Sequence, residues 1–417
     1  MDFFLKEESV KFRIFIFSLL ILFFYICAGT SLYYRERLLL GSLEEFNNDD
    51  VKYLRSADTL LKTGKFTYED PEKSTVFIMP GIVLVLLPFV KIFGMAGAVL
   101  PFQIFSAFLM TITVYVFFQF AKRQFGNLSA SIALVAMISY IPLVYISTLI
   151  LTETCFLFCF AWLLYFSGIA LAEKREKYYI VAGIAWGLAT LFRPMIVLFP
   201  VVLLILWMQK KSSFHEMKRY ATLLVIPFLF LLSPWWIRNA ITFQRFIPFT
   251  LSMGNPMLLG AFINNEVDFE LIERLNQNNL QYTDDFLWNN YVDMEFAKMV
   301  TEYHFRQDFW GYLKWILVTK TWLNFTDPYC LPGFYGLPIL WLQRQHLFYM
   351  LCGLLGMLIC LKKKKDSSFL LIFTVFYFAL AHLSVLAYSR YMIPVMPVMI
   401  LLGAEAVTTV VRKVDYS

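Results

Sequence analysis

The sequence predicts an all-α polytopic membrane protein: a bundle of about ten transmembrane helices with re-entrant or interfacial helices and two extracytoplasmic loops. Three observations support this fold class. The 417 residues are 59% hydrophobic, with a mean hydropathy of +0.63. The apolar runs are longer than a soluble domain needs. The basic residues, which give a net charge of +6, gather in short loops between these runs, which indicates membrane orientation and no nucleic-acid partner.

The N-terminal part is predicted to be one span followed by an outer loop. Lys6, Lys11 and Arg13 precede the first apolar run, about residues 14–32, so the positive-inside rule places the N-terminus in the cytoplasm. The run is long enough to span, and because no small-residue cleavage site follows it, we do not expect a cleaved signal peptide. Residues 34–77 should then form the first extracytoplasmic loop.

The next apolar segment, residues 78–94, is short and is interrupted by Pro80-Gly81 and Pro88. The basic clusters further along the chain fall on the cytoplasmic side only if this segment does not cross the membrane. We therefore predict a re-entrant or interfacial helix that dips into the outer leaflet.

Nine further runs are predicted to span, so that both chain ends are cytoplasmic and residues 1–417 form a single membrane domain. Basic clusters at residues 122–123, 173–177 and 210–219 lie between alternate runs, which places them inside. Residues 239–344 form a second extracytoplasmic region, and residues 345–417 hold the last spans. The predicted spans are about 97–120, 127–146, 148–172, 178–192, 194–209, 220–238, 345–361, 367–387 and 391–411.

An acidic pair, Asp49-Asp50, opens a predicted short helix directly after the first span. Asn48 can cap this helix and Gly64 can close it. The helix dipole favours carboxylates in a first turn. Helix capping alone could therefore explain the pair. Whether the pair has a functional role depends on which other charged residues lie at the same membrane depth.

Four further charged residues are predicted at the outer ends of spans: Glu153, Arg193, Arg238 and Arg390. An ionisable side chain at mid-membrane costs about 2.5–3.5 kcal/mol, so each needs a partner or a water-filled cavity. Each one alone could be structural, since arginines snorkel at helix ends and Glu153 could be a buried partner for one of them. Their common depth with Asp49 favours one site for an anionic, lipid-linked substrate. Arginines would bind its phosphate while a carboxylate accepts a proton.

These residues, in this order, resemble the GT-C superfamily of integral-membrane glycosyltransferases. The likeness is to the branch that holds the protein O-mannosyltransferases and the lipid A aminoarabinose transferases (glycosyltransferase family 39-like). The segments that carry it are Asp49-Asp50-Val51-Lys52-Tyr53, Met79-Pro80-Gly81, Leu151-Thr152-Glu153-Thr154, Gly187–Pro194, Pro234-Trp235-Trp236-Ile237-Arg238-Asn239 and Arg390-Tyr391-Met392-Ile393-Pro394.

The resemblance implies a GT-C-like bundle that uses a polyprenyl-phosphate sugar donor. A hexose or pentose would pass to a lipid, glycan or protein acceptor on the extracytoplasmic face of a plasma membrane, in a bacterium. Asp49 would be the general base of an inverting displacement, and Asp50 would position the acceptor or assist a metal.

The resemblance also implies the residues that hold the donor. Arg193, Arg238 and Arg390 would bind the leaving phosphate and stabilise its growing charge. Glu153 would orient a cation or contact the sugar. Tyr53 and Asn239 belong to the same motifs and complete the predicted donor-binding set.

No cofactor is certain, although the resemblance allows a divalent metal. Some relatives carry a Glu-Lys pair directly before the proline of the re-entrant helix, whereas this chain has Ile78-Met79 there. Glu72-Lys73 lies upstream and could substitute for that pair.

Two other functions stay open. A transporter or flippase of lipid-linked sugars would also need a membrane bundle with buried charges. However, the sequence shows no internal repeat, and the predicted charges lie on one side of the membrane. A membrane acyltransferase would need an intramembrane histidine with a polar partner, and His382 has apolar neighbours.

Overall fold

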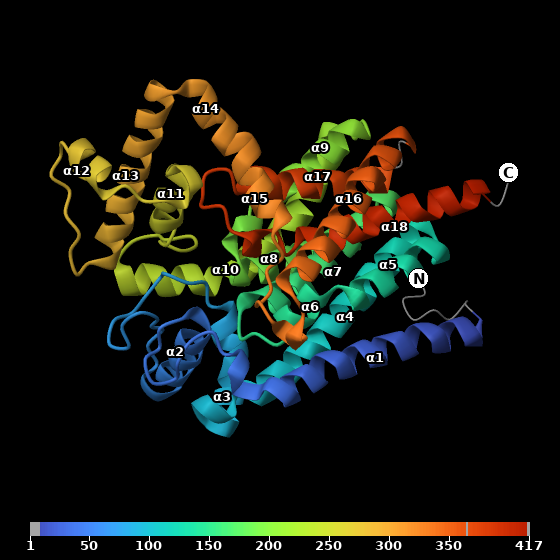
Figure 1. The fold of residues 1–417 in the computed structure, drawn as a ribbon, viewed down its shortest axis with the longest axis horizontal. Helices are drawn as coiled ribbons and strands as arrows, with labels where there is room; N and C mark the ends of the chain where they lie inside the picture. The colour runs from blue at the N-terminus through green and yellow to red at the C-terminus, as the bar shows by residue number, and fades with distance from the viewer. Residues whose placement is uncertain (1–8, 364–365, 415–417) are drawn as a thin grey trace.

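The structure is a computed structural model that describes residues 9–363 and 366–414, and within these ranges it is helical without strands, as predicted (Figure 1). Lys6, one of the basic residues behind the prediction of a cytoplasmic N-terminus, lies outside these ranges. The first half comprises α1 (Val10–Tyr34), η1 (Arg35–Leu38), α2 (Asp49–Thr63), α3 (Gly81–Gly97), α4 (Val99–Phe125), α5 (Asn127–Ser139), α6 (Ile141–Ser147), α7 (Thr152–Glu173), α8 (Glu176–Phe192), η2 (Pro194–Ile196) and α9 (Pro200–Gln209). The second half comprises α10 (Phe214–Phe243), α11 (Gly254–Ala261), η3 (Ile263–Asn265), α12 (Phe269–Leu275), α13 (Phe286–Gln307), α14 (Phe309–Lys314), η4 (Trp315–Thr319), α15 (Lys320–Thr326), η5 (Phe334–Gly336), α16 (Ile339–Lys363), α17 (Asp366–Ala381), η6 (Ser389–Met392) and α18 (Val395–Val414).

Six helices of the described chain, α1, α4, α7, α10, α16 and α18, are long and apolar enough to cross a membrane. The bent pair α5–α6, with 62° between its halves, would be a seventh span. The remaining three of the ten predicted spans form α8, α9 and α17, which have 17, 10 and 16 residues. These helices are shorter than the about 20 residues that a span usually takes. The Arg193-Pro194 turn ends α8, and a non-helical segment at residues 383–388 ends α17 early.

The helix that carries the acidic pair forms as its sequence predicts. Asn48 Oδ1 accepts a hydrogen bond from the Asp49 N–H at 2.7 Å, and Gly64 closes α2 in a left-handed conformation with φ of 72°. The following helix, α3, starts at Gly81, directly after Pro80. A Cβ at Gly81 would meet the Leu191 carbonyl oxygen at 2.6 Å. Glycine therefore lets the start of α3 lie against the end of α8.

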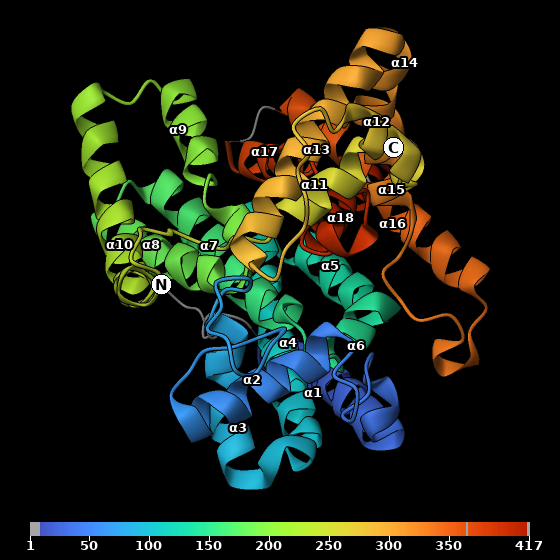
Figure 2. The ribbon, with the colours of Figure 1, turned by 90° about the vertical axis from the view of Figure 1, so that its left-hand side faces the viewer.

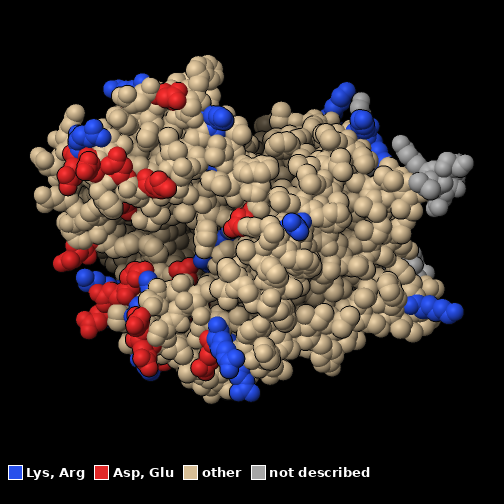
Figure 3. Space-filling view, in the orientation of Figure 1, with Lys and Arg blue, Asp and Glu red and all other residues tan. Residues whose placement is uncertain are grey.

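The bundle has two distinct ends. In Figure 1, α2 and α11–α13 lie at the left, and the first residues of α1 and the last of α18 lie at the right. Figure 2 looks onto the left end, with α2 below α11–α13. In Figure 3, Asp and Glu gather at this end, whereas the opposite end shows Lys and Arg. We call the end with α2 and α11–α13 the loop end.

Candidate active site

A buried carboxylate lies at the centre of the charged residues of the loop end. Glu153, in the first turn of α7, has a side chain only 2% exposed. Arg193 Nη2 donates to Glu153 Oε1 at 2.5 Å, and Arg193 Nε donates to Thr152 Oγ1 at 3.0 Å. Arg390 binds the same carboxylate with two groups, Nε to Oε1 and Nη2 to Oε2, the latter at 3.2 Å. Glu153 thus joins α7, the α8–η2 turn and η6.

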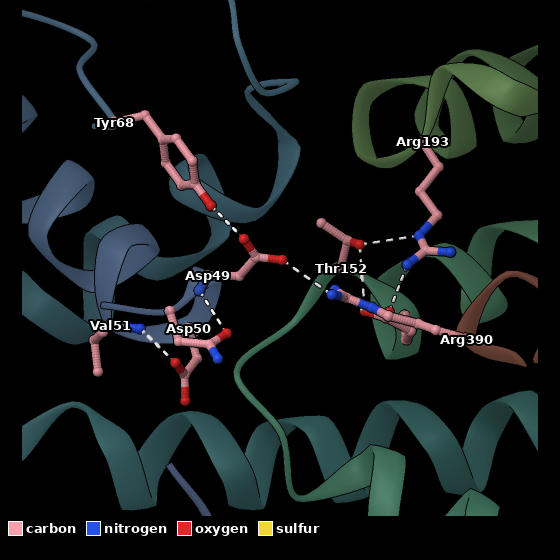
Figure 4. Close-up of polar contacts among 9 residues, drawn as sticks. Asp49, Asp50, Val51, Tyr68, Thr152, Arg193 and Arg390 are labelled. Carbon is pink, nitrogen blue, oxygen red and sulfur yellow. Dashed lines mark hydrogen bonds and ion pairs between the residues drawn. The ribbon is translucent and has the colours of Figure 1, made fainter. Parts of the chain in front are cut away.

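Arg390 also reaches the acidic pair. Its Nη1 donates to Asp49 Oδ2 at 2.9 Å, and Tyr68 Oη donates to Asp49 Oδ1 at 2.5 Å (Figure 4). The side chain of Asp49 is 37% exposed, whereas that of Arg390 is 12% exposed. Arg390 therefore lies as a bridge between one carboxylate that solvent can reach and one that is buried.

The four charges of this cluster balance one another, but their hydrogen-bonding capacity is not used up. A guanidinium carries five N–H groups. On acceptors in the described chain, Arg193 uses two of them and Arg390 three. The remaining N–H groups can bind an additional anion, and phosphate suits the planar fork of arginine.

Tyr68 is a site residue that no sequence motif indicated. It lies in an irregular loop 19 residues after Asp49 and is 1% exposed. Burial, together with neighbouring Tyr53 and the Asp49 carboxylate, raises the pKa of Tyr68, so its hydroxyl stays a donor. The predicted donor-binding residue Tyr53 is also buried, and its ring lies 5.6 Å from that of Tyr68. Tyr53 thus supports Tyr68 from within the fold.

Asp50 points away from the cluster (Figure 4). Its side chain is buried at 1% exposure, and it accepts the Leu40 N–H at 2.6 Å and the Val51 N–H at 2.9 Å. Burial raises the pKa of the Asp50 carboxyl. These contacts hold the start of α2 against residue 40, so the geometry offers no support for the predicted catalytic role of Asp50.

The structure does not bring Arg238 and Asn239 to the cluster. Arg238 donates to the carbonyl oxygens of Thr75 at 2.7 Å and Phe66 at 3.2 Å. Asn239, fully buried, donates to the Ile247 carbonyl oxygen at 2.9 Å. Both residues, which were predicted to belong to the donor-binding set, donate to backbone carbonyl oxygens, and Arg238 also donates to Asn239 Oδ1 at 3.0 Å. By fixing the loop between Phe66 and Thr75, Arg238 holds the segment that carries Tyr68.

The carboxylates of the site do not fit a metal centre. In the described part of the chain, no three His, Cys, Asp or Glu side chains come together in a way that could hold a metal ion. The Asp49 and Glu153 carboxylates are bridged by Arg390, whose positive charge opposes a cation between them. Glu72 and Lys73, the suggested substitutes, are exposed.

Comparison with known proteins supports the predicted resemblance. Residues 79–237 match the model of the family described as dolichyl-phosphate-mannose-protein mannosyltransferase. The archaeal oligosaccharyltransferase AglB from Archaeoglobus fulgidus, solved with an inhibitory peptide and a dolichol-phosphate, is similar with a TM-score of 0.56 and 15% identity. This match covers 97% of the present chain and 51% of AglB, so the chain spans about half of that protein. No curated protein matches the sequence.

The match to a second solved structure covers a larger share of the matched protein. ArnT from Cupriavidus metallidurans, bound to undecaprenyl phosphate, has a TM-score of 0.46 and 13% identity. The match covers 98% of the present chain and 80% of ArnT. The family match and the AglB-like fold confirm the resemblance to the GT-C glycosyltransferases that the motifs predicted.

Proposed function

We propose that this protein is a glycosyltransferase that moves a sugar from a polyprenyl-phosphate donor to an acceptor hydroxyl on the extracytoplasmic face of a membrane. The observation that carries the proposal is the bridge of Arg390 between Asp49 and Glu153, with Arg193 on the same Glu153. It joins a reachable carboxylate to two cations in one site. The similar fold of AglB, which was solved with a dolichol-phosphate, supports a lipid phosphate as the carrier.

Arg193 and Arg390 bind the leaving phosphate in this proposal. When the bond from sugar to phosphate breaks, the phosphate gains a second negative charge. The N–H groups that the two arginines do not use within the protein are available for that charge, and Glu153 holds both guanidinium groups in place beforehand. Donors fixed before the reaction stabilise the transition state without reorganisation.

Asp49 is the proposed general base. Its side chain is the more exposed carboxylate, and Tyr68 and Arg390 fix its orientation. The acceptor oxygen forms a bond to the anomeric carbon while the carbon–oxygen bond to phosphate breaks, with inversion. The acceptor proton passes to Asp49, and the bonding electron pair leaves with the phosphate. Asp50 and Arg238 hold α2 and the Tyr68 loop around this base.

The test is Asp49→Asn, assayed as release of undecaprenyl phosphate from undecaprenyl-phosphate hexoses and pentoses by mass spectrometry. We expect turnover to fall about 10²–10⁴-fold, with affinity for undecaprenyl phosphate unchanged within a few-fold. Asp58→Asn is the matched control, because Asp58 lies on the same helix and its carboxylate pairs with Lys62. Full transfer activity in Asp49→Asn would show that the general-base assignment is wrong.

The same preparations test the flippase alternative. A flippase moves a lipid-linked sugar across vesicles without breaking the bond to phosphate. If the wild-type protein translocates the labelled lipid but releases no undecaprenyl phosphate with any donor and acceptor, the glycosyltransferase proposal fails.

A further inference from the structure

The segment at residues 383–388 leads from α17 to η6, the turn that carries Arg390. Its backbone is held by hydrogen bonds with residues within 239–344. Five of its backbone groups hydrogen-bond to α11, η3 and α15. They are Leu383 O with Lys320 Nζ (2.9 Å), Leu386 N with Pro256 O (2.8 Å), Ala387 N and O with the Asn265 amide (3.1 and 3.2 Å), and Tyr388 N with Asn324 Oδ1 (2.7 Å).

Two of the three side chains that make these bonds are buried, Asn265 is partly buried, and the backbones lie unusually close. Lys320 is 1% exposed and also donates to the Gly260 carbonyl oxygen at 2.7 Å. A Cβ at Gly260 would meet the Val385 carbonyl carbon at 2.3 Å, so only glycine permits this approach of α11 to the segment. Asn324 is 3% exposed. A buried ammonium bonded to two carbonyl oxygens is costly, which argues for a specific task.

Tyr388 is separated from Arg390 by one residue. A displacement of residues 383–388 therefore also displaces the backbone of Arg390 and, with it, the guanidinium. Arg390 must meet Asp49 and Glu153 at the same time, and hydrogen bonds weaken steeply when their geometry is lost. We propose that Asn265, Lys320 and Asn324 are positioning residues, which hold residues 383–388 so that Arg390 lies between the two carboxylates. The consequence for phosphate binding rests on the function proposed above.

This assignment differs from a general contribution to stability. A residue that acts through Arg390 loses its effect on phosphate binding when Arg390 is already replaced. A residue that merely stabilises the fold has the same effect with or without Arg390. The difference can be measured in a double-mutant cycle.

The experiment uses full-length protein in lipid nanodiscs and undecaprenyl phosphate as the probe. We expect Asn324→Leu, which removes the acceptor for the Tyr388 N–H, to weaken binding about tenfold. In an Arg390→Gln background it should cause no further loss. Lys320→Met is the second variant, in case Asn324→Leu does not fold. Tyr312→Phe is the matched control, because Tyr312 Oη donates to the Ala261 carbonyl oxygen at 2.8 Å and to Thr301 Oγ1 at 3.5 Å in the same region, whereas residues 383–388 receive no hydrogen bond from it in the described chain.

Amide hydrogen exchange of residues 386–391 tests the positioning itself, without any ligand. It should rise in Asn324→Leu and Lys320→Met and stay at the wild-type level in Tyr312→Phe. Unchanged exchange in both variants, or an equal loss of binding with and without Arg390, would overturn the inference. If exchange rises but Arg390→Gln leaves the affinity unaltered, the positioning stands and the proposed phosphate role of Arg390 is wrong.

Discussion

Two buried charge clusters among the described residues lie at opposite ends of the bundle, and they are built differently. At the loop end, Glu153 forms ion pairs with Arg193 and Arg390, and Arg390 also pairs with Asp49. At the other end, Glu405 on α18 is 1% exposed. Its Oε1 accepts from Lys363 Nζ at 2.8 Å, and its Oε2 accepts from Ser129 Oγ at 2.8 Å.

The difference is whether spare N–H groups lie beside a carboxylate that solvent can reach. Each oxygen of Glu405 accepts a hydrogen bond, and Lys363 also donates to Thr409 Oγ1 at 2.6 Å. Within the described chain, Lys363 keeps one of its three N–H groups unused, but the carboxylate beside it, Glu405, is only 1% exposed. We call this group, which joins α5, α16 and α18, the closed cluster. The loop-end cluster keeps unused N–H groups on Arg193 and Arg390 and presents a half-exposed Asp49. Buried charge alone therefore does not indicate a site; spare donors beside a reachable base do.

Removing the bridging arginine should have the largest effect. Arg390→Gln removes the bridging guanidinium. Of the side-chain hydrogen bonds in the described chain, Asp49 then keeps that from Tyr68, and Glu153 keeps those from Arg193 and Thr152. We expect transfer to fall about 10²–10³-fold, measured as release of undecaprenyl phosphate per folded molecule. Lys363→Gln, the corresponding change in the closed cluster, should leave this rate unaltered. Equal losses in the two variants would erase the distinction between the clusters.

Tyr68→Phe should have the next largest effect. It removes one hydrogen bond to the proposed base, a bond to a charged group worth about 1.5–3 kcal/mol. We expect kcat to fall about 10–100-fold with the KM for donor unchanged. Tyr282→Phe removes a similar contact, from the exposed Tyr282 Oη to the partly buried Asp293 at 2.7 Å, elsewhere at the loop end. If both variants lose activity equally, Tyr68 has no specific role at Asp49.

Glu405→Gln should affect stability and leave catalysis unchanged. The neutral amide cannot compensate the Lys363 charge, although the Lys363 side chain is 32% exposed and is partly solvated. We expect a loss of about 1–3 kcal/mol in the free energy of unfolding, measured as a lower midpoint of thermal unfolding in detergent. A fall in kcat per folded molecule would instead show that the two ends are coupled.

Ser129→Ala should have the smallest effect. It removes one hydroxyl from Glu405, and the Lys363 pair stays in place. We expect about 1 kcal/mol of destabilisation and wild-type activity. A larger loss than in Glu405→Gln would contradict the view that the ion pair dominates this cluster.

The sequence predicted the all-helical bundle and the helix α2 because apolar runs, Asn48 and Gly64 act locally. It also predicted that Asp49, Glu153, Arg193 and Arg390 share one end, because charge in a membrane needs partners. It did not distinguish Arg238 from these residues, because arginine serves equally well to bond carbonyl oxygens at a helix end and to bind a phosphate.

Other features depend on the folded loops. Tyr68 and Asn324 meet their partners through irregular segments, for which the sequence carries no periodic signal. Glu405 could have been found, because it is an acidic residue inside the predicted span 391–411. The prediction that the charges within the spans lie on one side of the membrane overlooked Glu405 and has to be corrected.

The spacing of the loop-end cluster along the chain has a consequence for biogenesis. Tyr68 follows Asp49 by 19 residues and Arg193 follows Glu153 by 40, but Arg390 follows Glu153 by 237. At about 5–20 residues per second, the last arginine leaves the ribosome on the order of 10–50 s after Glu153. Until then, Arg193 can neutralise Glu153 within the α7–α8 hairpin, so that the hairpin enters the bilayer without net charge at this point. A chain that stops before Arg390 should still insert these two helices, which protease protection of nascent chains would show, and yet leave the bridge to Asp49 unmade.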